Sequence, residues 1–308
     1  MFGPFVTLPI STPWSQRMSL LVALSRRRNH SPVVYLVSLL FFAGCGGEPN
    51  WVKNEGSYCL PQTSERTEDC FVTTNRDGSY VVNNPEDLEK VCSTACDKVR
   101  YLEIRDIGAV RDLRSFRGIS VEETLFIRGN EYLQSTEGIT LKDDARLSLK
   151  DNSSLRELEG MSSVKNLQSL TFEGNNELTS LGSLQNLARV GGDESSVLWF
   201  WQTSIQDFSA LDGIEIKEGT NVLFQTNAQL TTLPQLEGKA AYVTLTNNKR
   251  LTDVSGLLGL DKLYQVDVGN NPNLPRCHVE EVVDQLEFYE ESNRPIIIQG
   301  NGSGDCAN

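Results

Sequence analysis

The sequence predicts a mainly β protein, a β-helical solenoid of about nine rungs with short capping helices, and three observations indicate this fold class. A short pattern recurs along the chain and is cleanest at residues 170–181, where Leu170 and Phe172 precede Asn175. Each copy alternates apolar and polar residues, which is typical of a short strand with one buried face. In most copies an Asn follows five positions after the first apolar residue, where its side chain can bond the main-chain groups of a turning backbone.

The copies follow one another at a spacing that favours stacking. Successive copies begin 21 to 30 residues apart. One such unit cannot bury its inward-facing pair alone, whereas units stacked in register form a continuous core. The copies begin at Leu102, Leu125, Leu147, Leu170, Leu198, Val222, Val243, Val266 and Ile296; the first of them lacks the Asn, and the copy at Leu198 has Thr203 in its place.

The N-terminal segment is typical of an exported protein. Three Arg at residues 26–28 precede an apolar run at residues 33–43, which is short for a membrane span and ends in small residues. The run leads into Cys45, and this arrangement resembles the lipobox of bacterial lipoproteins, in which the Cys is acylated after cleavage. We therefore expect a signal peptide over residues 1–44, with Met18 as a possible true start, and a lipidated tether over residues 45–58. The alternative is an ordinary cleaved signal followed by a coincidental Cys.

Composition agrees with export and excludes one class of partner. The chain has a formal net charge of −13, and residues 1–44 carry four Arg and no acidic residue, so the remainder has a charge of −17. So acidic a chain lacks the basic surface that nucleic-acid binding requires. Acyl chains on Cys45 would attach it to a membrane.

The cysteines predict a disulfide framework. Of seven Cys, Cys45 is assigned to the lipid, which leaves an even number in an oxidising compartment. Cys277 and Cys306 bracket the last strand and form the obvious pair. The other four allow three pairings, of which Cys70 with Cys96 is favoured; these are Cys59, Cys70, Cys92 and Cys96. A zinc site would need a second pair of ligands, and no His lies near these four, so we expect no metal.

Both ends of the solenoid carry capping signals, because an uncovered end would expose the core. Asn84 and Pro85 suit the start of a short helix over residues 85–91. Apolar residues at helical spacing, from Val279 to Leu286, predict a second helix over residues 277–288. The expected domains are an N-terminal cap at residues 59–98 and a repeat domain at residues 99–306, with its C-terminal cap from residue 275.

Taken together, these features resemble the receptor L-domain family, leucine-rich-repeat-like right-handed β-helices, and most closely the lipoproteins of myxobacteria and their relatives that carry this domain. The resemblance covers about residues 59–306. The matching residues are Cys70, residues 84–88, Cys96 and residues 102–104 at the front, and residues 271–275, Cys277, residues 300–301 and Cys306 at the back. It implies a right-handed β-helix bounded by disulfides.

The outward strand face is the candidate binding site, since the residue between the two apolar positions of a strand points away from the core. Bulky side chains gather on three successive rungs, and Phe126 lies on an earlier one; the binding residues we predict are Trp199, Trp201, Leu223, Tyr242 and Phe126. Two alternatives are that a loop at residues 189–196 covers the patch, and that a register shift places the Trp pair inside. Arg105, Arg128, Arg146 and Lys150 are interpreted as a solvated basic face.

The predicted function is non-catalytic. The chain has no Gly-rich phosphate loop and no convincing Ser-His-Asp set. We expect a lipoprotein of the bacterial outer membrane or cell surface that binds an envelope or extracellular protein, or a polysaccharide, without a cofactor. The alternatives are a structural envelope protein and a glycan-processing enzyme.

Overall fold

The computed structural model describes residues 79–84, 87, 98–290 and 296–304. All of them belong to the second of two compact units, Glu48–Asn308; the first unit is Met1–Gly47. The predicted signal peptide, Cys45, the tether and the four N-terminal cysteines lie outside the described residues, as does Cys306.

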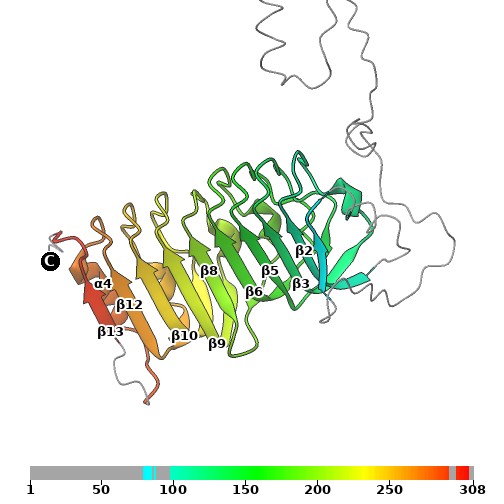
Figure 1. The fold of residues 1–308 in the computed structure, drawn as a ribbon. Coiled ribbons are helices and arrows are strands. Elements are labelled where there is room, and N and C mark those ends of the chain that lie inside the picture. The colour runs from blue at the N-terminus through cyan, green and yellow to red at the C-terminus, as the bar shows by residue number, and fades with distance from the viewer. Residues whose placement is uncertain (1–78, 85–86, 88–97, 291–295, 305–308) are drawn as a thin grey trace, which may run out of the picture. The chain divides into compact units, whose positions relative to one another are not determined.

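The described chain folds into a parallel 13-stranded sheet whose strands follow one another as rungs of a coil (Figure 1). This confirms the predicted solenoid: all nine copies of the sequence pattern form adjacent strands, joined by about eight turns. The strands of the long face are β1 (Ser79–Val82), β2 (Lys98–Arg105), β3 (Ser120–Arg128), β5 (Ala145–Lys150), β6 (Asn166–Glu173), β8 (Val197–Trp201), β9 (Ile214–Gln225), β10 (Leu236–Thr246), β12 (Gln265–Gly269) and β13 (Ile296–Gln299).

Register across this face matches the sequence pattern residue by residue. Leu170 pairs with Leu147 on one side and with Leu198 on the other, and Val243 pairs with Val222 and Val266. Because the first apolar residue of each copy lies beside its counterpart, every inward side chain stacks on another inward side chain.

A second, narrower strip of the same sheet precedes the long face in several rungs. It consists of the first residues of β3, β6, β9 and β10 together with β4 (Thr140–Leu141), β7 (Arg189–Val190) and β11 (Leu260–Lys262). We call the bend between the two strips the corner; it includes residues 191–196 and 217–219. β9 runs through both strips, and Gly219 within it has φ 86°.

Buried Asn side chains form a ladder at the end of the strands. The Oδ1 atom of each Asn accepts the backbone N–H of the corresponding residue one rung earlier, as Asn152 does from Asn130 at 3.2 Å. Its Nδ2 donates to a strand carbonyl, as Asn152 does to Ile127 at 2.9 Å. Thr203 replaces the Asn in one rung and donates its hydroxyl to Asn227. The ladder residues are Asn130, Asn152, Asn175, Thr203, Asn227, Asn248, Asn271 and Asn301.

The third side of the coil carries short 3₁₀ helices, η1 (Arg114–Phe116), η2 (Gly182–Leu184), η3 (Ser209–Leu211) and η4 (Ser255–Leu257). Each follows a polar side chain that accepts the backbone N–H two residues later. Asp207 accepts from Ser209 at 2.9 Å, and Asp253 accepts from Ser255 at 2.7 Å. These side-chain turns start each helix by bonding an amide that has no partner within the helix.

The core contains an aromatic stack in the middle of the solenoid. Phe172, Phe200 and Phe224 occupy the same position on β6, β8 and β9 and are fully buried. Their ring centroids are 5.3 and 5.1 Å apart, and Phe208 meets Phe200 edge-on at 5.1 Å. The stack joins the Thr203 rung to its neighbours.

The structure describes only part of the first predicted capping helix but all of the second. At the first, the Asn84 side chain accepts the Asp87 N–H at 2.9 Å, as an N-cap does, but most of that helix lies outside the described residues. At the second, α4 (Arg276–Val283) ends five residues before the predicted limit. The prediction was wrong there because Phe288 forms a parallel bridge with Leu263, which requires extended backbone.

Candidate functional site

The outer surface of the long face presents three rows of side chains that run across the rungs. The middle row holds Glu103, Phe126, Ser148, Thr171, Trp199, Leu223, Thr244, Asp267 and Ile297, as predicted. Burial raises the pKa of Asp267 in this row, and its Oδ1 is buried without a hydrogen-bond partner among the described residues. The face is therefore mixed in character, with apolar and polar groups side by side.

Trp199 and Trp201 form a stacked pair on this surface. Their ring centroids are 5.8 Å apart and their planes differ by 6°. Both side chains are half-buried, whereas Phe200 between them is fully buried. The Trp199 Nε1–H donates to Gln225 on the next strand at 3.1 Å. The register alternative, in which the pair points inward, is thus wrong.

The loop at residues 191–196 makes its polar contacts away from the Trp pair. Asp193 Oδ2 lies 2.6 Å from an Arg146 nitrogen on β5 and also accepts a hydrogen bond from Gln168 on β6. Burial alone would raise the pKa of Asp193, but hydrogen bonds from Ser195 and Ser196 and the Arg146 charge together lower it. These contacts anchor the loop over β5 and β6, so they do not support the alternative that it covers the indoles.

The five predicted binding residues divide into three groups. Leu223 pairs with Trp199 across β8 and β9, so the Trp pair and Leu223 form one patch. Phe126, 45% exposed, lies on β3, with β5 and β6 between it and β8. Tyr242, 49% exposed, lies at the corner and stacks on Tyr264 rather than on the Trp pair.

The basic residues of the early strands are partly exposed, in agreement with a solvated face, and each also lies near a carboxylate of the chain. Arg105 and Arg128 both lie near Glu103, at 3.8 and 2.6 Å. Lys150 lies 2.6 Å from Glu173, whose hydrogen bond raises the pKa of Lys150. Arg146 binds Asp193, as described above. These carboxylates compensate the positive charges, which leaves little net positive potential for an acidic partner.

Sequence reasoning missed a row of three tyrosines at the corner. Tyr242 stacks on Tyr264 with centroids 6.3 Å apart, and Tyr264 stacks on Tyr289 at 4.2 Å. We call Tyr242, Tyr264 and Tyr289 the tyrosine row. Tyr242 and Tyr264 line a cavity of about 500 Å³ together with Glu194, Glu218, Gly219, Asn221 and Ala241. Leu263 and Phe288 form a parallel bridge, so the residues that follow them, Tyr264 and Tyr289, lie side by side. Sequence reasoning did not predict this bridge and therefore missed the row.

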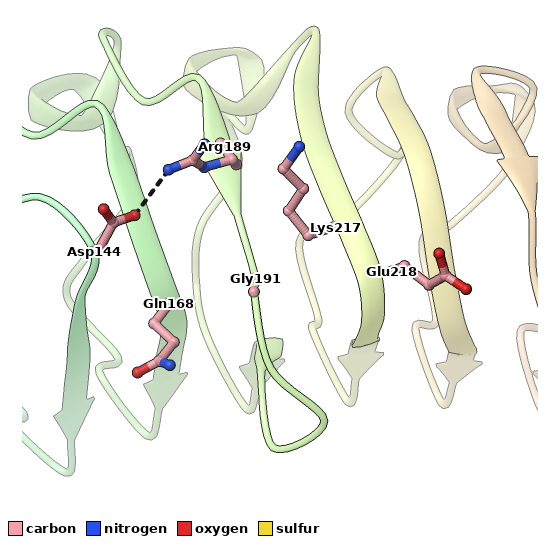
Figure 2. Close-up of a pocket in the computed structure, with 7 residues that line it drawn as sticks. Asp144, Gln168, Arg189, Gly191, Lys217 and Glu218 are labelled. Atoms are coloured by element: carbon pink, nitrogen blue, oxygen red, sulfur yellow. Dashed lines mark hydrogen bonds and ion pairs between the residues drawn. The ribbon is translucent and has the colours of Figure 1, made fainter.

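A second cavity, of about 530 Å³, is lined by Gly191 and Gly192 of the 191–196 loop and shares Glu218 with the first. Figure 2 shows its lining, in which Arg189 reaches Asp144 at 2.9 Å. Lys217 is engaged with Glu215 at 2.6 Å. Gly191 closes this part of the corner with φ 113°, and a Cβ there would lie 1.9 Å from the Thr220 hydroxyl. Asp144, Arg189 and Lys217 are paired within the chain, and the remaining charged residue, Glu218, also lines the tyrosine-lined cavity. This cavity therefore offers a ligand less than the tyrosine-lined one.

Within the described ranges, no group of three or more His, Cys, Asp or Glu side chains is placed to hold a metal ion. In the same part of the chain, no helix is long and apolar enough to cross a membrane. The expectations of no cofactor and no catalysis stay predictions.

Fold and surface together define a class: a parallel β-solenoid with a broad outer strand face and a tyrosine-lined corner cavity. Comparison with protein-family models, curated proteins and solved structures found no match.

Proposed function

We propose that the chain is a non-catalytic binding protein whose outer strand face engages an extended partner, a protein surface or a polysaccharide, at Trp199, Trp201 and Leu223. The observation that carries this proposal is the stacked, half-buried indole pair on an otherwise mixed surface. Trp side chains supply a large contact area at low cost in conformational entropy, and they dominate many interfaces. The flat parallel face suits an extended partner better than a small metabolite.

Replacing both Trp199 and Trp201 with Ala tests this proposal. Binding to immobilised envelope proteins and polysaccharides should weaken at least tenfold, because each truncation removes a large interface contact. The control is Leu258→Ala, which removes an exposed apolar side chain (44% exposed) beside η4, away from the long face. Both variants should retain the native melting transition.

If the folded double variant binds as tightly as wild type, the proposal that the Trp pair forms the binding surface is refuted. Absence of any binding by wild type would favour the structural envelope protein. Release of reducing ends from polysaccharides would favour the glycan-processing enzyme.

The sequence features support a second part of the proposal, that the chain is exported and held at a bacterial outer membrane by acyl chains on Cys45. The basic and apolar segments before Cys45 and the resemblance to receptor L-domain lipoproteins both favour it. Two acyl chains give stable membrane attachment, whereas one gives marginal attachment.

Replacing Cys45 with Ser should move the protein from the detergent-extracted membrane fraction to the soluble fraction, because no thiol remains to be acylated. Fractionation followed by immunoblotting measures this change, and Ser57→Ala is the control in the same segment. Retention of the Cys45→Ser protein in membranes would contradict lipidation.

A further inference from the structure

The tyrosine-lined cavity has a wall chemistry that points to one kind of ligand. Its polar lining consists of the carboxylates of Glu194 and Glu218, the amide of Asn221 and the two tyrosines. The Oδ1 atom of Asn221 is itself buried and accepts no hydrogen bond from the residues that the structure describes. No Lys or Arg is among the lining residues. The wall is therefore rich in hydrogen-bond acceptors and negative charge.

Aromatic faces add a second attraction for cations. The tyrosine row places three stacked rings beside the cavity, with Tyr242 the most open to solvent among its lining tyrosines. A cation already lies against this row, because Lys262 Nζ is 4.8 Å from the centroid of the Tyr289 ring. An ammonium or guanidinium over a tyrosine face is stabilised by the ring quadrupole.

The Glu218 carboxylate and the loop backbone that carries Glu194 are held in place before any ligand arrives. The Tyr289 hydroxyl donates to Glu218 Oε1 at 3.0 Å. In Figure 2 the Glu218 side chain extends toward the neighbouring rung, away from Arg189. Glu194 lies on the loop that Asp193 fixes through Arg146, and Asn221 N–H donates to the Ser196 carbonyl at 3.0 Å. Such preorganisation lowers the entropic cost of binding.

We infer that this cavity binds the side-chain cation of a Lys or Arg in a basic segment of a partner protein. Two carboxylates accept N–H bonds from the cation while the Tyr242 and Tyr264 rings contact its alkyl stem and charge. The chain's formal net charge of −13 draws a basic segment toward the site. This site is separate from the Trp pair and does not depend on it.

Isothermal titration of the full folded chain with a tri-arginine and a tri-lysine peptide tests the inference, at low and at high salt. Glu194→Gln with Glu218→Gln should weaken peptide binding at least tenfold, and Tyr242→Leu should weaken it severalfold. The matched control is Glu131→Gln with Glu177→Gln, which removes the same charge from two exposed sites elsewhere. It should bind the peptides like wild type, apart from a small uniform loss.

If the cavity double variant and the control double variant lose the same peptide affinity, the inferred site is refuted. That result would show only a general attraction of basic peptides to an acidic surface. Binding of cellohexaose that depends on Glu194 and Glu218, with no peptide binding, would overturn it in favour of a sugar site. Trp199→Ala with Trp201→Ala should leave peptide binding unchanged. That variant separates failure of this inference from failure of the proposed function.

Discussion

The side chain of each interior Asn bonds backbone groups of the rung that precedes it. Asn248 is fully buried; its Oδ1 accepts the Asn227 N–H at 2.9 Å and its Nδ2 donates to the Phe224 carbonyl at 2.8 Å. The strands end at these groups, so no ladder partner would take the place of the amide. Side-chain amides thus replace the missing strand hydrogen bonds at the turns where an Asn occupies the ladder position, whereas the Thr203 hydroxyl bonds the Asn227 side chain.

Replacing Asn248 with Ala should destabilise the protein by about 2 to 6 kcal/mol, because two buried backbone groups lose their partners at about 1 to 3 kcal/mol each. Urea unfolding at neutral pH measures the change. Lys249→Ala is the control, since its side chain is exposed one residue later. A loss below about 1 kcal/mol for Asn248→Ala would contradict the structural role of the ladder.

Sequence reasoning found the ladder and the Trp pair but not the tyrosine row. The Asn positions recur at fixed spacing, so a pattern search detects them. Tyr289 was hidden because apolar spacing extended the predicted helix through Phe288, and a helix would have placed Tyr289 elsewhere. Its contact with Glu218, 71 positions earlier, depends on coil geometry that no local pattern contains.

The 3₁₀ helices begin on side-chain turns whose acceptors are mostly Asp and Ser. Hydrogen bonds from the Ser209 side chain and backbone lower the pKa of Asp207. For Asp253, burial would raise the pKa, but hydrogen bonds from Ser255 and His278 outweigh burial and lower it. The ionised carboxylate is therefore the form that the folded state favours at both turns.

Acid should weaken these two turns. Each of these Asp residues has a lower pKa in the folded state than in the unfolded state, where it is near 4. The resulting stabilisation is fully present at pH values above the unfolded-state pKa. It is lost as the pH falls through the folded-state pKa. Asp207→Asn with Asp253→Asn keeps an acceptor oxygen at each turn but removes the titration. The variant should lose less unfolding free energy than wild type between pH 7 and pH 3. Urea unfolding across this range, with exposed Asp261→Asn as control, measures it, and identical pH profiles would contradict the assignment.

Strands of the long face could be predicted from alternation, whereas the shorter elements could not. β4 and β7 have two residues each and β11 has three, too few to show a period. The 12-residue β9 runs through the corner, whereas sequence reasoning recognised only its part from Val222 and treated residues 189–196 as a loop. The corner cavity was missed for this reason, although the long face was correctly placed.

At the scale of the whole molecule, each rung contacts mainly its neighbours, so stability accumulates along the coil and the ends are its weakest points. β13 ends the sheet of the described chain with Ile296 44% exposed. α4 packs three buried valines beside this end, Val279, Val282 and Val283. A covalent link between α4 and the segment after β13 would hold the last rung against fraying.

Cys277 and Cys306 are predicted to form that link. The Cys277 Sγ lies 3.5 Å from the Gly304 carbonyl oxygen, two residues before Cys306, so the last described residues approach the sulfur as a bridge requires. Closing a loop of this length contributes about 2 to 4 kcal/mol. Cys277→Ser should therefore lower the unfolding free energy by about this amount under oxidising conditions, as measured by urea unfolding. Reductant should lower the stability of wild type more than that of Cys277→Ser, because the variant has already lost this bridge. Equal stability of variant and wild type without reductant would show that no bridge closes this end.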